Sequence, residues 1–198
     1  MKKSIAKNFL ALDYEAIVMG VSAGGFQALT ILLPCLPKNF SLPVLIVQHT
    51  IPDADDFFPG YLSQKAHVPV RHAVDKEPVK PGIVYLAPPN YHLMVEYDRT
   101  LSLSVDDPVN FARPSIDVLF ETAAAVYGPH LVGVILTGAS ADGSLGLKAV
   151  KDAGGLAIVE HPRTAEVDFM PKSAIRTVEV DAILPLKAIG KMLARLAD

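Results

Sequence analysis

Short runs of apolar residues alternate along the chain with longer segments whose apolar positions recur every three or four residues. The short runs are nearly unbroken, which is typical of strands buried on both faces of a parallel sheet. They predict strands at Glu15–Met19, Pro43–Gln48, Val132–Leu136, Leu156–Val159 and Ala182–Leu184. The helical spacing predicts helices at Gly24–Leu33, Asp53–Gln64, Pro114–Val126, Asp142–Ala153 and Leu186–Leu196. This alternation indicates an α/β fold, a doubly wound and mostly parallel sheet with helices on both faces.

The middle of the chain has a different pattern. Three short apolar runs, at Gly82–Ala87, His92–Tyr97 and Leu101–Val105, follow one another without a helical segment. They are separated by the turn sequences Pro-Pro-Asn at 88–90 and Asp-Arg-Thr at 98–100. Such punctuation predicts an antiparallel β-hairpin insertion in the α/β unit.

Composition narrows the class of protein. The chain has 198 residues, 51% of them hydrophobic, and a formal net charge of −3. We expect one domain over residues 1–198, with residues 1–14 as an N-terminal extension. A lone cysteine, Cys35, suits a reducing compartment, so we expect a cytoplasmic protein without a signal peptide. The absence of a basic cluster argues against nucleic acid as a partner, and the uncharged stretch 16–37 is interrupted by glycines and proline, which argues against membrane insertion.

A serine follows the first predicted strand. Gly20-Val21-Ser22-Ala23-Gly24 matches the G-x-S-x-G pattern of a nucleophile on a strand-to-helix turn, where flanking glycines tolerate a strained backbone. Two other interpretations stay open: Ser22 can simply cap the helix, and the turn can cradle a phosphate. A dinucleotide fingerprint would need glycine at position 22 and an acidic residue after the second strand, where Gln48 and His49 stand instead.

A histidine and an aspartate follow two further predicted strands. His49 comes at the carboxyl end of the second strand, and Asp142 lies in the glycine-rich turn after Val132–Leu136. Taken alone, Asp142 reads as a cap of the helix that it precedes. If the strands before Ser22, His49 and Asp142 are parallel, all three residues emerge at one edge of the sheet. His49 can then take the Ser22 proton while Asp142 orients the imidazole, which predicts a Ser-His-Asp catalytic triad.

Backbone amides near this edge can stabilise an oxyanion, and we expect donors at Ala23, His49 and Ala139. The order Ser, His, Asp differs from the Ser, acid, His order of the α/β-hydrolases, which argues against that superfamily. The histidines show no H-x-x-x-H spacing and there is no second cysteine, so we expect no metal.

With these residues identified, the chain resembles the catalytic domain of the CheB family, the bacterial chemotaxis protein-glutamate methylesterases. The resemblance runs nearly end to end and rests on six ordered blocks: G-V-S-A-G-G at 20–25, V-Q-H at 47–49, P-G-I-V-Y-L-A-P-P-N-Y-H-L at 81–93, R-P-S-I-D-V-L-F at 113–120, L-T-G-A-S-A-D-G at 136–143 and M-P at 170–171. It implies hydrolysis of glutamate γ-methyl esters on methylated chemoreceptor cytoplasmic helices or other chemosensory proteins, often with glutamine deamidation and without a cofactor. The family's triad falls on Ser22, His49 and Asp142.

The chain departs from the family pattern at three places. The segment before the first strand is too short for the receiver domain that family members usually carry, so we expect constitutive activity or control by a separate response regulator. Ala139 and Ser140 replace the family's Met-Gly pair, and Phe169 replaces the glycine of Gly-Met-Pro. Two alternative functions stay open, a catalytically weak receptor-binding adaptor and a small-molecule esterase that uses the same site.

Overall fold

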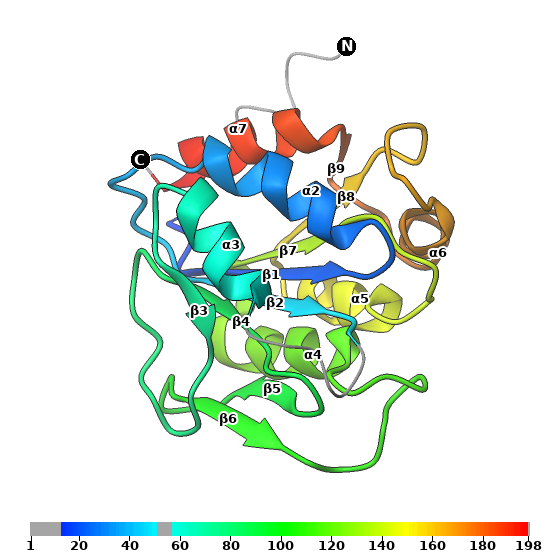
Figure 1. The fold of residues 1–198 in the computed structure, drawn as a ribbon. Coiled ribbons are helices and arrows are strands. Elements are labelled where there is room, and N and C mark those ends of the chain that lie inside the picture. The colour runs from blue at the N-terminus through cyan, green and yellow to red at the C-terminus, as the bar shows by residue number, and fades with distance from the viewer. Residues whose placement is uncertain (1–12, 51–56, 198) are drawn as a thin grey trace.

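The computed structural model describes residues 13–50 and 57–197. Seven strands form one parallel sheet in the order β3-β4-β2-β1-β7-β8-β9, and β5 and β6 form a separate antiparallel pair (Figure 1). The strands of the large sheet are β1 (Ala16–Val21), β2 (Val44–Gln48), β3 (Val70–His72), β4 (Val84–Leu86), β7 (Leu131–Ile135), β8 (Leu156–Glu160) and β9 (Ala182–Leu184). The small pair consists of β5 (His92–Val95) and β6 (Leu101–Ser104).

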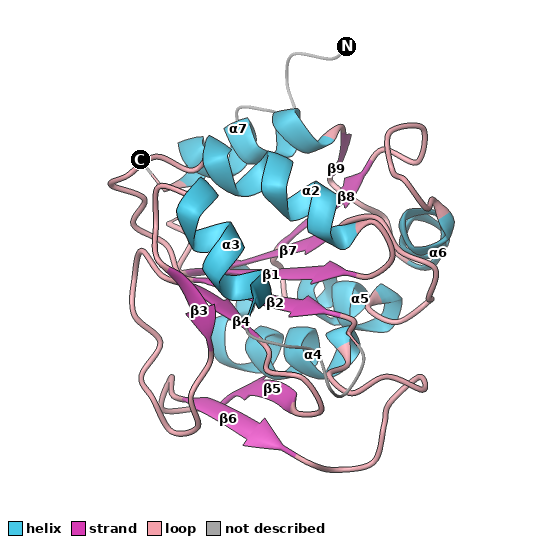
Figure 2. Cartoon of the chain, in the orientation of Figure 1, coloured by secondary structure: helices cyan, strands magenta, loops and turns pink. Residues whose placement is uncertain are grey.

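Helices cover both faces of the sheet (Figure 2). The α-helices are α2 (Gly25–Leu32), α3 (Phe57–Lys65), α4 (Ile116–Tyr127), α5 (Ser144–Asp152), α6 (Phe169–Thr177) and α7 (Leu186–Leu196), with short 3₁₀ turns at Leu33–Cys35 and Gly128–His130. Residues of α2, α3 and α7 share one apolar core with one face of the sheet, and residues of α4, α5 and α6 share a second core with the other. The β5–β6 pair packs outside α4 and belongs to the second core.

The predicted fold class is confirmed, and five predicted strands and five predicted helices are present within a few residues of their expected bounds. The expected start of one helix at Asp53 and most of the expected N-terminal extension lie outside the described residues. No helix in the ranges 13–50 and 57–197 is long and apolar enough to cross a bilayer.

One part of the predicted hairpin insertion is wrong. The run Gly82–Ala87 contains β4, which pairs in parallel with β2 and β3 in the large sheet instead of joining the insertion. Only β5 and β6 form the antiparallel hairpin. All three residues of β4 are buried, like nearly all residues of the other internal strands of the large sheet. An uninterrupted apolar strand of this kind is typical of a parallel sheet that is covered on both faces.

The strand order places a crevice at the middle of the sheet. β1 lies between β2 and β7, and the chain leaves β1 toward α2 on one face and reaches β7 from α4 on the other. This is a topological switch point, where open α/β sheets bind ligands beyond the carboxyl ends of their strands. The residues that follow β1, β2 and β7 are Ser22, His49 and the loop that contains Asp142.

Candidate functional site

Ser22 lies in a tight turn between β1 and α2, and two glycines make the turn possible. Gly24 has a φ of +78°, a left-handed conformation that favours glycine. A Cβ on Gly20 would stand 2.4 Å from Cγ2 of Ile116, so the strand before the serine can approach α4 only without a side chain there. The local sequence therefore brings Ser22 to the carboxyl edge of the sheet, half-buried at the end of β1.

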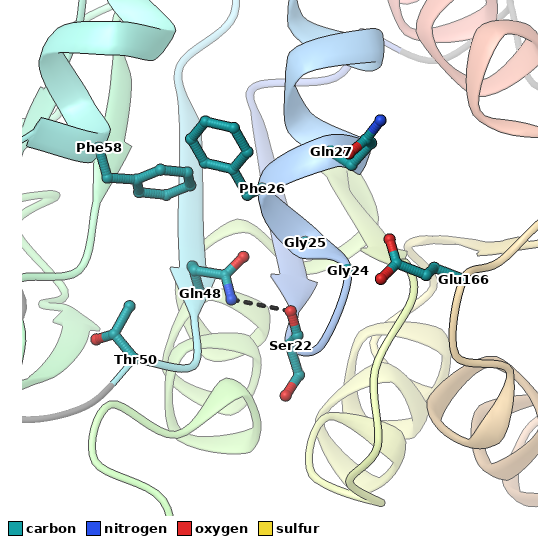
Figure 3. Close-up of a pocket in the computed structure, with 9 residues that line it drawn as sticks. All are labelled: Ser22, Gly24, Gly25, Phe26, Gln27, Gln48, Thr50, Phe58 and Glu166. Atoms are coloured by element: carbon teal, nitrogen blue, oxygen red, sulfur yellow. Dashed lines mark hydrogen bonds between the residues drawn. The ribbon is translucent and has the colours of Figure 1, made fainter.

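His49 lies beside Ser22 on the neighbouring strand. Val21 pairs with Gln48 in the parallel register of β1 and β2, so the next residues, Ser22 and His49, face each other across adjacent strands. The Gln48 amide ties the two together, because its Nε2 donates to the Ser22 carbonyl at 3.0 Å and to the His49 carbonyl at 2.9 Å. Figure 3 shows the first of these bonds, with the Ser22 hydroxyl pointing away from Gln48.

Asp142 completes the expected set. His49 Nε2 lies 2.8 Å from Asp142 Oδ2, although the two residues are 93 positions apart in the chain. The Asp142 side chain is fully buried, while that of His49 is 16% exposed. With Nε2 directed at the carboxylate, Nδ1 is the ring nitrogen left for a second partner. Among the described residues, no hydrogen bond joins the Ser22 hydroxyl to the imidazole.

The Asp142 carboxylate is surrounded by donors. Besides His49, it accepts hydrogen bonds from the backbone N–H of Ile116 at 2.6 Å, the backbone N–H of Asp117 at 3.2 Å, the Ser115 hydroxyl at 2.8 Å and the Asn110 amide at 3.1 Å. Burial alone would raise its pKa, but the bonds from these groups outweigh the desolvation and lower the pKa below its ordinary value. Asp142 is therefore ionised at neutral pH.

These bonds correct one expectation from the sequence. Asp142 reads as a cap of the helix that it precedes, α5, but its carboxylate accepts the first backbone N–H groups of α4 instead. Asp117, in the first turn of α4, accepts the N–H of Gly146 in α5 at 2.6 Å. Each of the two aspartates thus satisfies the N-terminal amides of the other's helix.

Asp117 differs from Asp142 in its titration. Burial raises the pKa of Asp117 to about 6, and the neighbouring negative charge of Asp142 adds to the rise, while hydrogen bonds from backbone N–H groups and from Asn110 oppose it. The sequence suggests only that Asp117 suits the helix dipole of α4. Its hydrogen bond with Gly146 of α5 could not be predicted, because it depends on how α4 packs against α5.

Asn110 bridges both aspartates, a role that no pattern in the sequence predicts. Its Nδ2 donates to Asp117 Oδ2 at 2.7 Å and to Asp142 Oδ1 at 3.1 Å. The residue has a φ of +52° and lies in the loop between β6 and α4. A single asparagine in a polar loop belongs to no hydrophobic periodicity. Its only signal in the sequence is its place in V-N-F-A-R-P-S at 109–115, directly before α4.

The three expected oxyanion donors have different environments. The His49 N–H donates to the Val21 carbonyl at 3.0 Å, so it is engaged in the sheet and is not a free donor. The amides of Ala23 and Ala139 donate to none of the described residues. The loop that carries Ala139 passes close to the serine, because a Cβ on Gly138 would lie 2.9 Å from Ser22 Cβ. Ser140, which stands where the resemblance expects glycine, accepts the Asp142 N–H at 3.1 Å and so stabilises the turn.

Two open clefts flank these residues. One, of about 380 Å³, is lined by Ser22 and Gln48 together with Phe26, Phe58 and Glu166 (Figure 3). The other, of about 280 Å³, is lined by His49 together with residues of the β6–α4 loop. Thr50 lines both clefts. Within residues 13–50 and 57–197, no cluster of three or more His, Cys, Asp and Glu side chains could hold a metal ion.

Comparison with known proteins identifies the family. The family model described as CheB methylesterase matches residues 17–193. A protein of Clostridium acetobutylicum is 34% identical over 182 residues, and one of Thermotoga maritima is 36% identical over 189 residues; both are named protein-glutamate methylesterase/protein-glutamine glutaminase. The matches cover 92% and 94% of this chain but 53% and 55% of the relatives, so the chain spans about half the length of these two proteins.

A shorter relative and a crystal structure agree. A protein of Leptospira interrogans, to which the same double name is given provisionally, is 51% identical over 185 residues, with 93% of this chain and 96% of its own length covered. The crystal structure of the Thermotoga maritima CheB methylesterase catalytic domain superposes with a TM-score of 0.88 at 36% identity, covering 93% of this chain and 100% of that domain. With matches in sequence and in fold over nearly its whole length, the chain belongs to the CheB methylesterase family.

Proposed function

We propose that this protein hydrolyses glutamate γ-methyl esters on methylated chemoreceptor helices or related chemosensory proteins and releases methanol. The observation that carries the proposal is the 2.8 Å contact of His49 Nε2 with the buried Asp142 carboxylate, at the strand end facing Ser22. Membership of the CheB methylesterase family supplies the substrate class. The three side chains have the roles of nucleophile, general base and orienting acid.

The reaction follows from these roles. Ser22 Oγ attacks the ester carbonyl and transfers its proton to His49 Nδ1, so a tetrahedral intermediate with an oxyanion forms. The intermediate expels methoxide, which leaves as methanol with the proton from His49, and an acyl-enzyme ester on Ser22 remains. A water molecule then attacks this ester, again with His49 as base. Collapse of the second intermediate returns the proton to Ser22 and releases the glutamate side chain.

Asp142 supports both steps without changing its own protonation. Its carboxylate keeps the proton of His49 on Nε2, which leaves Nδ1 unprotonated and able to accept the serine proton. It also stabilises the imidazolium that forms when the proton arrives. The hydrogen bond between serine and histidine that is missing here is expected to form with substrate, because such contacts are often long in the free enzyme.

We assign the oxyanion to the amides of Ala23 and Ala139, which donate to none of the described residues. Each such donor lowers the barrier by on the order of 3 kcal/mol where it has been measured in other enzymes. The His49 N–H already donates to the Val21 carbonyl, so we do not assign it this role.

The test is methanol release from a methylated receptor fragment. Ser22→Ala should abolish release while the folded state, followed by circular dichroism, is unchanged. Ser41→Ala is a matched control, because the Ser41 hydroxyl donates to the Ala197 carbonyl at the other end of the sheet. Methanol release by Ser22→Ala at the wild-type rate would remove the serine mechanism. Because the relatives' names include glutaminase, ammonia release from an unmodified receptor glutamine should depend on Ser22 in the same way.

A further inference from the structure

A phenylalanine stands at the tip of the loop between β6 and α4. Val109 and Ala112 exchange two backbone hydrogen bonds, of 3.1 and 3.0 Å, and enclose Asn110 and Phe111 in a tight turn. Both enclosed residues have positive φ, +52° and +63°. Turns of this kind favour asparagine at the first of the two positions and glycine at the second. Phenylalanine at the second position is strained, because its Cβ crowds the backbone in the left-handed region.

The turn is held from both sides. Asn110 donates to two buried aspartates, Asp117 in α4 and Asp142 in the loop between β7 and α5. Arg113 donates from Nε and Nη2 to Asn90 Oδ1 at 3.0 and 2.7 Å, and from Nη1 to the carbonyls of Val105 and Asp106 at 2.7 and 3.0 Å. The position of Phe111 is therefore set by its neighbours and not by contacts of its own ring.

The ring itself is fully exposed. Phe111 has a relative exposure of 105%, whereas phenylalanines of folded proteins are mostly buried. It lines the same cleft as His49 and Thr50, on the loop that projects past the carboxyl ends of the strands (Figure 1). Placing Asn110 on Asp142 does not require the ring, since glycine at 111 would form the turn with less strain. Neither stability nor the positioning of Asn110 explains the side chain.

We propose that Phe111 is a specificity-determining residue whose ring packs on an apolar side chain of the substrate protein next to the methylated glutamate. The inference rests on the proposed function. Thr50 lies between the cleft of Ser22 and the cleft of Phe111, so a protein surface that presents an ester to Ser22 extends across His49 toward the ring. On a substrate helix, residues three or four positions from the glutamate share its face, at the spacing of neighbouring side chains.

Strain at such a position is consistent with a role in binding. A phenylalanine side chain has only two torsion angles to fix, so covering its ring costs little conformational freedom, which is the usual property of an anchor residue in an interface. Asp106 and Asp107, the exposed charges nearest in the loop, are acidic and would not attract the glutamate product. Because the Phe111 side chain is a phenyl ring, the contact that it offers is apolar. It is made with the protein around the ester and not with the ester itself.

The experiment removes the ring and the strain together. Phe111→Gly should leave the melting temperature unchanged or raised, because glycine accepts the φ of +63°. It should lower kcat/KM for a methylated receptor fragment about tenfold through KM, and change kcat/KM for p-nitrophenyl acetate less than twofold. Phe111→Tyr should keep wild-type values. Tyr97→Ala removes another exposed aromatic ring, 84% exposed in the β5–β6 turn, and is the control for an unspecific effect.

Three outcomes would overturn the inference: equal receptor kinetics in Phe111→Gly and wild type, an equal loss on both substrates, or an equal loss in Tyr97→Ala. Binding is measured separately on the Ser22→Ala background, where no turnover occurs. There, adding Phe111→Gly should raise the Kd for the methylated fragment about tenfold, and an unchanged Kd would refute the contact. If the wild-type protein releases no methanol, the proposed function fails, and this binding measurement still decides on Phe111.

Discussion

Replacing Asp142 by asparagine should affect stability and activity together. The carboxylate accepts five hydrogen bonds, and every partner is a donor. An asparagine can keep its oxygen toward Ser115, Asn110 and the Asp117 amide, but its NH2 group then faces the donors of His49 and Ile116. Two hydrogen bonds to an ionised group are lost, each worth about 1.5–3 kcal/mol. We therefore expect the free energy of unfolding to fall by about 3–6 kcal/mol. Domains of this size have a free energy of unfolding of about 5–15 kcal/mol.

The activity of Asp142→Asn should fall further than its stability suggests. The NH2 group forces His49 to present an unprotonated nitrogen toward position 142, so the nitrogen facing Ser22 carries the proton and cannot accept one. The equivalent change in a chymotrypsin-like protease lowers kcat about 10⁴-fold for this reason, and we expect a loss of that order in methanol release.

Urea unfolding at pH 7 and methanol release from a methylated receptor fragment test these two effects. Asp152→Asn is the control, since Asp152 is an exposed carboxylate paired with Lys148 and its loss should cost about 1 kcal/mol or less. Because the folded-state pKa of Asp142 is lowered, its contribution to stability is present above pH 4 and is lost as the pH falls through the folded-state pKa. A variant that unfolds within 1 kcal/mol of wild type and keeps kcat/KM within tenfold would refute the reasoning.

Two further predictions concern Asp117 and Gly138. Burial raises the folded-state pKa of Asp117 from 3.8 to about 6, so the stability gained by the protonated group is complete below pH 4 and is lost as the pH rises through 6. The free energy of unfolding of the wild type, measured with urea, should include a loss of about 2–3 kcal/mol between pH 4 and pH 7 that is due to Asp117. Asp117→Asn should remove this loss, and an equal change with pH in both proteins would contradict the assignment. Gly138→Ala places a Cβ 2.8 Å from Met170 Sδ and 2.9 Å from Ser22 Cβ, so we expect at least tenfold slower methanol release. Gly60→Ala, where no atom lies within 4 Å, is the matched control, and equal rates in both variants would argue against crowding at the serine.

The large sheet could be predicted because its internal strands are continuous apolar runs. Ala182–Leu184 and Leu186–Leu196 match the predicted bounds, since Pro185 separates a strand from a strongly amphipathic helix. β3 and α6 were not predicted. β3 has only three residues and a polar Arg71-His72 end, and α6 has only nine residues with Pro171 within its first turn. Neither segment has enough periodicity to stand out from a loop.

The arrangement around Ser22 and His49 was predicted by topology, because parallel strands deliver their carboxyl ends to one edge. The surroundings of Asp142 were not predictable in the same way. Apart from His49, its donors come from residues 110–117, which precede it by more than 20 positions and meet it only when α4 packs on α5. Likewise, the engaged amide of His49 depends on the register of β1 and β2, which a single strand does not reveal.

The Asp142 carboxylate has two functions at once, because it accepts the first amides of α4 and also orients His49. A lineage that abandoned ester hydrolysis could discard Ser22 at little structural expense, because few groups depend on its hydroxyl. It could not discard Asp142 as freely, since the first backbone N–H groups of α4 would lose their acceptor. Inactive descendants of such a domain should therefore lose the serine first and retain the aspartate long after its chemistry has ceased to matter.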